Sequence, residues 1–360
     1  MQIPDMMCAM VTMGHGDLDQ MVWHENWPCP KPTQGEVLIR VKACGLNNTD
    51  VNTRSGWYSK TVSDRTTGGA FETVGADDPT WGGAPIRFPR IQGADVCGEI
   101  VAVGAGVDPR RVGERVITDN WLRDPDDPDN LDKTGYFGSE RDGGFAQFTT
   151  IPSQNALAIQ SLLSDAELAT FSCSYSTAEG MLTRAHVAAS DTVLVPGASG
   201  GVGGALVQLA KLRGARVIAL ASEAKHDAVA KLGPDRVLPR APRDLKSVLA
   251  DERITVVADV VGGDGWPMLI DVLQRGGRYT CSGAIAGPIV SMDLRTFYLR
   301  DLTFTGSTII PPTVTENLIR YIEAGSIKPV LAATFPLRDL HAAQQAFIDK
   351  TMTGNIVVCP

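Results

Sequence analysis

Two hydrophobic patterns divide this chain of 360 residues. In the first part, short apolar runs alternate with polar positions and are separated by glycine and proline, which is typical of β-strands. We expect strands at 8–13, 36–43, 98–104 and 113–117. In the second part strands and helices alternate. We expect helices at 164–185, 264–274 and 313–324 and strands at 254–261, 278–282 and 302–306. This alternation predicts a parallel sheet covered on both faces.

The clearest pattern is a β-branched run at 192–195, a glycine-rich turn and an amphipathic helix, followed by a strand at 215–221. Such a unit presents backbone N–H groups and a positive helix end to a pyrophosphate. The turn positions that we expect to contact this group are Ala198, Ser199, Gly200, Gly201 and Val202. Ala198 replaces the first glycine of G-x-G-x-x-G, so the complete βαβ unit carries the interpretation. A glycine turn in an unrelated α/β fold is the alternative.

The two patterns predict an α/β protein with two domains. The β-rich domain is expected to comprise residues 1–158 and 310–360, and a doubly wound parallel-sheet domain to comprise residues 159–309. The apolar stretch 354–358 is too short to stand alone, so we expect it to rejoin the β-rich domain. A dinucleotide would bind between the domains, at the carboxyl ends of the parallel strands.

Composition and charge exclude several classes of function. Acidic residues outnumber basic ones by 41 to 33, and no run of Lys and Arg is arranged to neutralise nucleic-acid phosphates. No apolar run approaches the length of a bilayer span, and no signal peptide is apparent, so we expect a cytoplasmic protein without a membrane partner. The seven cysteines include no C-x-x-C pair, which argues against a disulfide framework or a cysteine-rich zinc site.

Two long polar segments interrupt the β-rich part. Residues 57–89 are rich in glycine yet carry several aromatic side chains, which predicts a lid or a partner contact rather than a spacer. Residues 123–132 are acidic but lack the spacing and terminal glutamate of a calcium loop, which favours a solvated surface loop.

A series of short motifs runs along the chain: Pro32-x-x-Gly35-Glu36-Val37-Leu38, Gly45-x-Asn47-x-x-Asp50, Gly93-x-Asp95-x-x-Gly98, Gly113-Glu-Arg-Val116, the 198–203 turn, Asp259-Val-Val-Gly-Gly263, Gly276-Gly-Arg278 and Gly354-x-Ile356-Val357. Their number, order and spacing resemble the medium-chain dehydrogenase/reductase superfamily over essentially the whole chain. The resemblance implies a GroES-like catalytic domain, a Rossmann domain and a homodimer. Strand 302–306 is apolar enough to be the edge that pairs across the dimer axis.

The zinc alcohol dehydrogenases of this superfamily carry Cys-His-x-Asp where this chain has Asn47-Asn48-Thr49-Asp50, and Gly-His-Glu where it has Gly93-Ala94-Asp95. Their third ligand matches Cys173. Alanine and asparagine do not supply the nitrogen and sulfur ligands that Zn²⁺ needs. The loop at 119–142 also lacks the four cysteines of their structural zinc lobe. We therefore expect no zinc, with an unusual metal set of Cys44, Asp95 and Cys173 as the alternative.

Without zinc, the resemblance favours the branch of quinone oxidoreductases and enone or enoyl-thioester reductases. In that branch the cofactor supplies a hydride, and the protein supplies position and a proton donor. A tyrosine of its enoyl reductases corresponds to Tyr58, so the resemblance assigns the catalytic role to Tyr58 with Asn47. A phenol with the ordinary pKa near 10 is protonated at neutral pH and can donate to a developing enolate. The alternative is that Tyr58 only packs at the base of the loop.

The cofactor is expected to be NADPH rather than NADH. NAD-specific relatives place an acid at the end of the second strand, where this chain has Ala221. Ser222 and Lys225 follow and are suited to a 2′-phosphate, whereas Glu223 favours NADH if the strand register differs by two residues. The remaining cofactor contacts that the resemblance implies are Thr177, Val261, Gly262, Ser282, Gly283 and Asn355.

Three functions follow from these observations. The first is a zinc-free, NADPH-dependent reductase of quinones or α,β-unsaturated carbonyl compounds, and this is the one that we expect. The second is an alcohol dehydrogenase with an atypical metal site. The third is a non-catalytic NADPH-binding protein of the same fold. The sequence does not name the substrate, because the insertion at 57–90 shapes the pocket.

Overall fold

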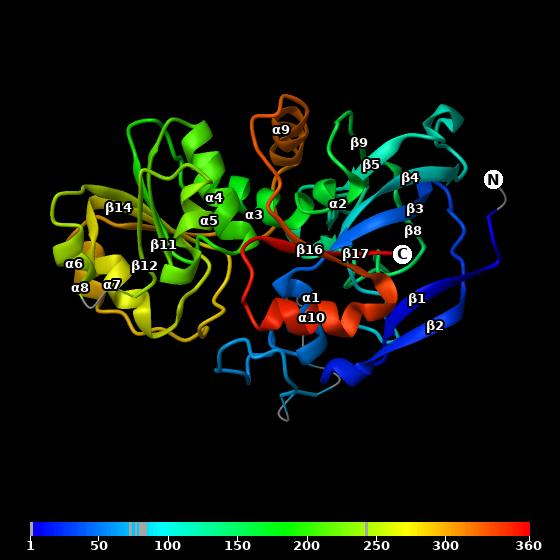
Figure 1. The fold of residues 1–360 in the computed structure, drawn as a ribbon, viewed down its shortest axis with the longest axis horizontal. Helices are drawn as coiled ribbons and strands as arrows, with labels where there is room; N and C mark the ends of the chain where they lie inside the picture. Colours follow the sequence, from blue (N-terminus) through cyan, green and yellow to red (C-terminus); the bar gives the residue numbers. More distant parts are fainter. Residues whose placement is uncertain (1–2, 72–73, 76–77, 79–84, 242–243) are drawn as a thin grey trace.

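The structure is a computed structural model and describes residues 3–71, 74–75, 78, 85–241 and 244–360. Two sheets lie side by side along the long axis of the molecule (Figure 1). One is parallel and carries helices on both faces, and the other is mainly antiparallel. This α/β architecture is the one that the sequence predicts, with a Rossmann-type domain beside a GroES-like domain.

The parallel sheet has six strands in the order β12-β11-β10-β13-β14-β15. Their bounds are Thr192–Val195 (β10), Arg216–Ala221 (β11), Arg236–Pro239 (β12), Ile254–Asp259 (β13), Leu273–Cys281 (β14) and Thr303–Gly306 (β15). The main helices around it are α3 (Ser172–Arg184), α4 (Gly201–Leu212), α5 (His226–Ala230), α6 (Leu245–Val248), α7 (Trp266–Asp271) and α8 (Leu294–Tyr298). The strand–turn–helix–strand unit predicted at 192–221 is therefore confirmed.

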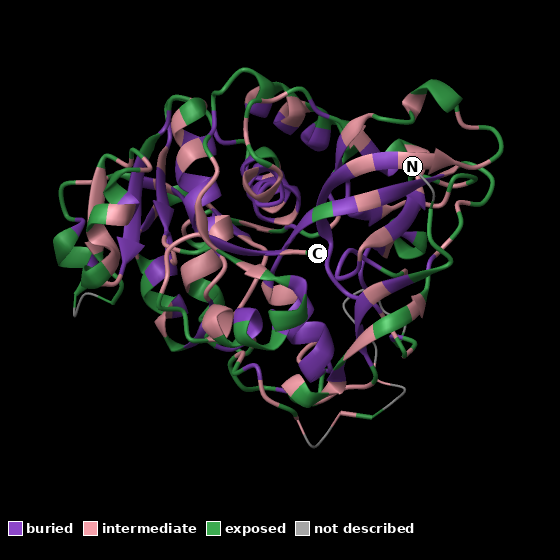
Figure 2. Ribbon diagram, turned by 45° about the vertical axis from the view of Figure 1, so that its right-hand side comes forward, coloured by how far each residue is buried: buried purple, intermediate pink, exposed green. Residues whose placement is uncertain are grey.

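Both faces of this sheet are buried, as Figure 2 shows. Along β10, Val193 and Val195 belong to a core shared with α3 and α4, whereas Leu194 belongs to the opposite core with α6 and α7. Successive side chains of a strand point to opposite faces, so a continuous apolar run is what a sheet covered on both sides requires.

The second sheet has seven strands in the order β16-β17-β3-β4-β5-β9, with β8 also paired to β3. The bounds are Glu36–Gly45 (β3), Asp95–Val103 (β4), Arg115–Thr118 (β5), Phe148–Pro152 (β8), Ala156–Ala158 (β9), Leu331–Pro336 (β16) and Asn355–Cys359 (β17). Val357 in β17 pairs antiparallel with Gly45 in β3, so the C-terminal strand rejoins the β-rich domain as predicted. The domain boundaries at 158/159 and 309/310 stay predictions.

The remaining elements surround this sheet. They are β1 (Met6–Thr12), β2 (Met21–Pro28), α1 (Asn48–Ser55), β6 (Trp121–Leu122), β7 (Gly135–Tyr136), α2 (Asp165–Leu168), α9 (Pro312–Glu323) and α10 (Leu340–Ile348). None of the helices that the structure describes is long and apolar enough to cross a membrane.

The structure differs from the expected elements in several places. We expect no strand between residues 13 and 36, but β2 pairs with β1 there. The single helix expected at 164–185 is divided into α2 and α3. The acidic loop contains Asp124 and Asp127, which pair with Lys133 at 3.7 and 3.0 Å.

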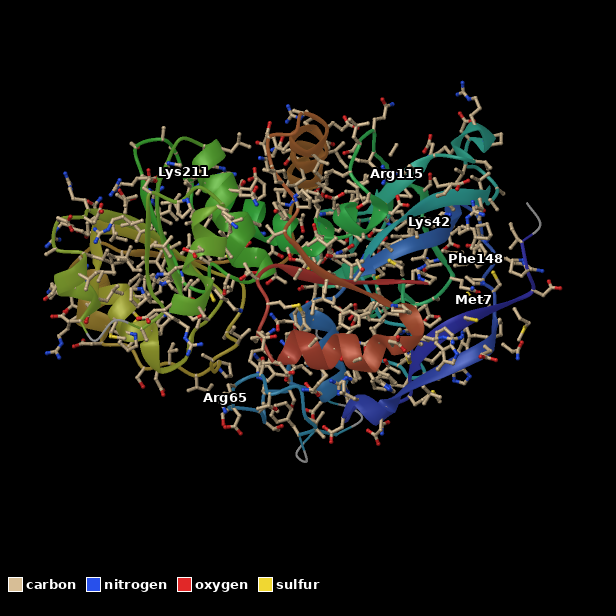
Figure 3. The ribbon with its side chains drawn as sticks, viewed as in Figure 1. Met7, Lys42, Arg65, Arg115, Phe148 and Lys211 are labelled. Atoms are coloured by element: carbon tan, nitrogen blue, oxygen red, sulfur yellow. The ribbon has the colours of Figure 1, made fainter. Side chains whose placement is uncertain are left out.

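The insertion after α1 reaches across to the nucleotide domain. The Thr66 N–H donates to the Ile285 carbonyl at 3.1 Å, next to Arg65, which Figure 3 labels. The fully buried Arg54 donates to the Gly68 carbonyl at 3.0 Å and so fixes the insertion to α1. The predicted lid also includes residues 72–73, 76–77 and 79–84, which lie outside the described residues, so a lid role stays a prediction.

Candidate active site

The glycine turn between β10 and α4 has the geometry of an anion site. Gly197 has φ 68°, a left-handed conformation that glycine adopts without strain. A side chain at Gly203 would clash with the Gly197 carbonyl, so only glycine lets the helix start this close to the strand. Ser199 is half-buried and Gly200 is exposed, and the first N–H groups of α4, at Gly201 and Val202, have no partner within the helix. The turn therefore offers free donors to an anionic group.

Two of the predicted contacts lie behind this turn. Ala198 is fully buried, and its N–H donates to the Leu220 carbonyl at 3.1 Å. The Asn355 amide donates to the Thr170 carbonyl at 3.2 Å and to the Ser174 hydroxyl at 3.0 Å. Both hydrogens of that amide are used, and its oxygen lies close to Gly201, so the cofactor contact of Asn355 stays a prediction.

The carboxyl ends of β13 and β14 bring four predicted contacts to the same edge of the sheet. The buried Asp259 carboxylate accepts from the N–H groups of Val261 at 2.7 Å and Gly262 at 3.2 Å, which fixes that turn. The Ser282 N–H donates to the Asp259 carbonyl at 3.2 Å, and Gly283 follows directly. A Cβ at Gly197 would lie 2.9 Å from Val261, so this turn adjoins the glycine turn.

Ser222 and Lys225 lie where β11 ends, as predicted. Ser222 is half-buried at the first position after the strand, and Glu223 beside it is exposed. The Lys225 ammonium donates to the carbonyls of Lys350 and Met352, both at 2.6 Å. Lys225 thus ties the nucleotide domain to the segment before β17, a contact that the sequence does not predict.

Helix α3 presents one face to the space beneath the catalytic sheet. Cys173 and Thr177 are one helical turn apart and half-buried, whereas the residues between them are buried. Burial raises the pKa of the Cys173 thiol well above its usual value, and hydrogen bonds from Tyr136 and Thr177 oppose this shift. Cys173 is therefore a neutral thiol beside Thr177, rather than a thiolate available to a metal.

The N-terminus of α1 is fixed by Asp50. Its buried carboxylate accepts from the N–H groups of Asn47 at 2.8 Å and Gly93 at 3.1 Å. Burial raises the pKa of Asp50 to about 7, although these hydrogen bonds lower it. The contacts connect Asn47 with the 93–95 segment, so two of the motifs meet in space.

Asp95 is the centre of a buried polar network. Its carboxylate accepts from the Asn120 amide and from the Cys173 N–H, both at 2.9 Å. Burial raises the pKa of Asp95 to about 6, while hydrogen bonding from Asn47 and Asn120 lowers it. The Tyr136 hydroxyl accepts from the Asn120 amide at 3.4 Å. Amide, thiol and phenol groups thus surround the Asp95 carboxylate.

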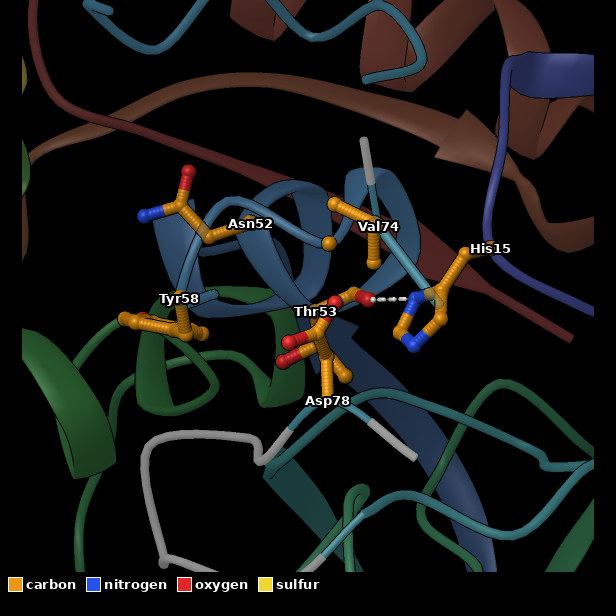
Figure 4. Close-up of a pocket in the computed structure, with 7 residues that line it drawn as sticks. His15, Asn52, Thr53, Tyr58, Val74 and Asp78 are labelled. Carbon is orange, nitrogen blue, oxygen red and sulfur yellow. Dashed lines mark hydrogen bonds between the residues drawn. The ribbon is translucent and has the colours of Figure 1, made fainter. Parts of the chain in front are cut away.

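Tyr58 follows α1 and is half-buried. Burial raises the pKa of Tyr58 to about 12, while hydrogen bonds with the side chains of Asn52 and Thr49 lower it. A cavity of about 10 Å³ lies beside Tyr58 and Asn52, with His15 bonded to the Thr53 carbonyl on its other side (Figure 4). This volume holds about one water molecule, so the cavity is not a substrate pocket. The tyrosine is placed as a neutral hydroxyl near Cys173.

The residues do not fit the zinc site of the alcohol dehydrogenases. Within the part of the chain that the structure describes, no three His, Cys, Asp or Glu side chains gather closely enough to hold a metal ion. Cys44 is fully buried, and its thiol lies close to where side chains at Gly93 and Gly144 would be. The alternative metal set of Cys44, Asp95 and Cys173 is therefore not assembled in this structure.

Three polar residues of this region were absent from the predicted site. Thr49 and Tyr136 bond to Tyr58 and Cys173 respectively, and Lys350 lies beside Lys225. Thr49 carries a hydroxyl inside the 47–50 motif, so the sequence alone could have indicated it as a site residue. Tyr136 and Lys350 are distant in sequence from the motifs, and only tertiary contacts bring them to the site.

Comparison with known proteins follows the same division of the chain. The family model "Alcohol dehydrogenase GroES-like domain" matches residues 33–161, and the model "Zinc-binding dehydrogenase" matches residues 201–324. A solved Sinorhizobium meliloti structure, provisionally described as an alcohol dehydrogenase, is 44% identical with a TM-score of 0.90. That match covers 99% of this chain and 98% of the other.

Two further relatives have more specific names. Acryloyl-coenzyme A reductase from Metallosphaera sedula is 28% identical, over 91% of this chain and 93% of the relative. The chloroplastic NADPH-dependent alkenal/one oxidoreductase of Arabidopsis thaliana is 27% identical, over 99% of this chain and 81% of the relative.

Proposed function

The chain belongs to the medium-chain dehydrogenase/reductase superfamily of oxidoreductases, and from this premise we propose that it is a zinc-free, NADPH-dependent reductase of quinones or α,β-unsaturated carbonyl compounds. Two relatives support the substrate class, because acryloyl-coenzyme A and alkenals or alkenones are conjugated carbonyl compounds. The missing zinc ligands at Asn47 and Ala94 support the absence of a metal.

The cofactor would lie along the carboxyl ends of the parallel strands. Ser199, Gly200 and the first turn of α4 would hold its diphosphate, and Ser222 would lie beside the adenosine ribose. Thr177 and the turns at 261–262 and 282–283 would enclose the nicotinamide. When bound, this group supplies the hydride. The protein's part is to position it against the substrate and to exclude water.

One observation carries the proposal: a neutral tyrosine hydroxyl near Cys173, on the wall where zinc-binding side chains are absent. Thr49 and Asn52 bond to the Tyr58 side chain, and its pKa of about 12 keeps the phenol protonated at neutral pH. Tyr58 can therefore donate a hydrogen bond or a proton to the carbonyl oxygen as negative charge develops there. Asn47, at the start of α1, helps to form the same wall.

An alcohol dehydrogenase is the second candidate, because the 44% identical structure carries that provisional description. An alcohol needs a group that removes its proton, and zinc relatives use the metal for this. Near Tyr58 the Asp50 carboxylate accepts from Asn47 and Gly93, and one oxygen of Asp95 accepts from Asn120 and Cys173. The missing zinc ligands at Asn47 and Ala94 favour reduction over alcohol oxidation.

We also propose a homodimer. Strand β15 is the last strand of the described parallel sheet, so its outer edge has unpaired backbone groups. Next to it, Ile289, Leu294, Tyr298 and Leu299 are between 55 and 71% exposed. Large apolar side chains gathered beside a free edge support pairing of β15 with its copy in a second subunit.

The test is NADPH consumption with a quinone, an enone and an enoyl thioester, compared with NADP⁺ reduction by a panel of alcohols. Turnover with conjugated carbonyl compounds and none with alcohols supports the proposal. Turnover with alcohols alone would favour the dehydrogenase, and NADPH binding without any turnover would favour a non-catalytic role.

A further inference from the structure

The insertion after α1 forms a bridge between the two domains at residues 64–68, which we call the bridging segment. Its Thr66 N–H donates to the Ile285 carbonyl of the nucleotide domain at 3.1 Å. The Thr66 hydroxyl donates to the side-chain oxygen of Asn52 in α1 at 3.2 Å. One residue therefore contacts both domains, through its backbone on one side and through its side chain on the other.

The Ile285 end of this bridge belongs to the wall that would enclose the nicotinamide. Ile285 follows the turn at 282–283, and its N–H donates to the Val260 carbonyl at 3.4 Å. The next N–H, at Ala286, donates to the Val261 carbonyl at 2.8 Å. The bridge thus ends on the loops that would hold the cofactor.

The other end of the bridge, Asn52, is held in the last turn of α1. Asn52 is 5% exposed, and its backbone carbonyl accepts from the N–H groups of Gly56 and Trp57, the latter at 2.9 Å. Gly56 has φ 79°, the left-handed conformation that commonly ends a helix. Tyr58 follows this turn, bonds to the Asn52 side chain, and lines the small cavity of Figure 4 together with Asn52.

These contacts determine which end of the Asn52 amide faces the tyrosine. The amide oxygen accepts from Thr66, so the NH₂ group is left to donate to the Tyr58 oxygen. The hydrogen bonds with Asn52 and Thr49 both lower the pKa of Tyr58, as donors to a phenol oxygen do, although burial raises it. A hydroxyl has one hydrogen and two lone pairs. An oxygen that accepts two bonds therefore keeps its own hydrogen for a third partner.

The bridging segment is fixed at both of its ends. The Asp64 carbonyl accepts from the indole N–H of Trp57 at 2.8 Å. The Gly68 carbonyl accepts from the fully buried Arg54 at 3.0 Å. Removing the Thr66 hydroxyl should therefore leave the segment in place and change only the contact with α1.

We propose that Thr66 is a positioning residue for the proton donor: it orients the Asn52 amide, which leaves the Tyr58 hydrogen free for the substrate. This inference rests on the proposed function. When a hydride adds to the β-carbon of an enone, an electron pair moves to the carbonyl oxygen and takes the Tyr58 proton, and the enol then tautomerises to the ketone. The bonds from Asn52 and Thr49 would stabilise the remaining phenolate until water returns a proton. Because Thr66 also contacts the nucleotide domain, both domains together would set the donor.

The test measures kcat and KM with an enone and with a quinone for the parent, Thr66→Val, Thr66→Ser and the control Thr67→Val. Valine has the shape of threonine without the hydroxyl, so Thr66→Val should lower kcat on the enone by about three- to tenfold, the value of one neutral hydrogen bond. The KM for NADPH and kcat on the quinone should stay nearly unchanged, and Thr66→Ser should restore kcat on the enone. Thr67 is an exposed neighbour whose hydroxyl accepts from the Gly69 N–H at 3.3 Å, so Thr67→Val should match the parent.

Combining Thr66→Val with Tyr58→Phe separates this role from a structural one. If Thr66 acts through Tyr58, the double variant should have the same kcat on the enone as Tyr58→Phe alone, because no hydroxyl remains to be oriented. Losses that multiply in the double variant, or an equal loss with the enone and the quinone, would show that Thr66 only holds the insertion in place.

Two further results distinguish this inference from the proposed function. If kcat on the enone is unchanged in Thr66→Val but reduced in Tyr58→Phe, the inference is wrong and the proposed function stands. If Tyr58→Phe matches the parent, or if the parent reduces no conjugated carbonyl compound, the proton-donor role or the proposed function fails, and the inference fails with it.

Discussion

Replacing Tyr58 by phenylalanine removes one hydroxyl and keeps the ring. That hydroxyl bonds to the side chains of Thr49 and Asn52, and its pKa of about 12 makes it a hydrogen-bond donor throughout the neutral range. General-acid assistance is worth about 10²–10⁴-fold, so kcat on an enone should fall by this factor, which corresponds to about 3–5 kcal/mol of lost transition-state stabilisation.

The effect on stability should be much smaller. Two neutral hydrogen bonds contribute about 0.5–1.5 kcal/mol each, and the Asn52 oxygen keeps its bond from Thr66 at 3.2 Å. We therefore expect the free energy of unfolding to fall by about 1–3 kcal/mol, and NADPH binding to be unchanged.

The assay is steady-state NADPH oxidation with an enone and with a quinone, each measured for the parent, Tyr58→Phe and the control Tyr321→Phe in α9. A quinone accepts a hydride more readily without an acid. The fall in kcat caused by Tyr58→Phe should therefore be smaller with the quinone than with the enone. The control should match the parent on both substrates. Enone turnover of Tyr58→Phe within twofold of the parent would refute the proton-donor role and leave Tyr58 as a packing residue.

Elemental analysis of the purified protein should find well under one zinc per chain, and chelator treatment should leave activity unchanged; stoichiometric, tightly bound zinc would contradict the metal-free proposal. Because burial raises the pKa of Asp50 from its ordinary value to about 7, the folded state binds its proton more tightly, and the stabilisation present at low pH is lost as the pH rises through 7. Chemical denaturation of the parent and of Asp50→Asn gives two free energies of unfolding at each pH. The parent value minus the variant value should decrease between about pH 4 and pH 7, by up to about 4 kcal/mol. A difference that does not change with pH would show that Asp50 is ionised throughout this range. Light scattering at micromolar concentration should report a dimer that Leu294→Asp converts to monomer, whereas a monomeric parent would refute pairing through β15.

The sequence predicted the nucleotide domain well because its signals are local. The run at 192–195, the glycine turn and the helix that follows are adjacent in the chain, and each requires only its neighbours to take its conformation. Strand β2 was missed for the opposite reason. Its residues 22–27 are mostly half-buried or exposed and include polar side chains, so alternation gives little signal without the partner strand β1.

The candidate site was predicted only as far as its motifs extend. Tyr58 comes shortly after the end of α1, which contains Thr49 and Asn52, so its contacts with these two residues follow from local structure. The partners of Lys225 are 125 and 127 residues away, and nothing near Lys225 in the sequence indicates them. Asn355 is predicted at the cofactor from its motif position, and that position gives no sign that its amide donates to Thr170 and Ser174.

The most direct test of the central claim is the position to which the hydride goes. Chelator-treated protein is incubated with NADPH carrying deuterium at C4 of the nicotinamide and with an α,β-unsaturated ketone, and the product is analysed by NMR. The account predicts a saturated ketone with deuterium on the β-carbon. Deuterium on the carbonyl carbon of an allylic alcohol, or turnover that returns only when zinc is added, would contradict it.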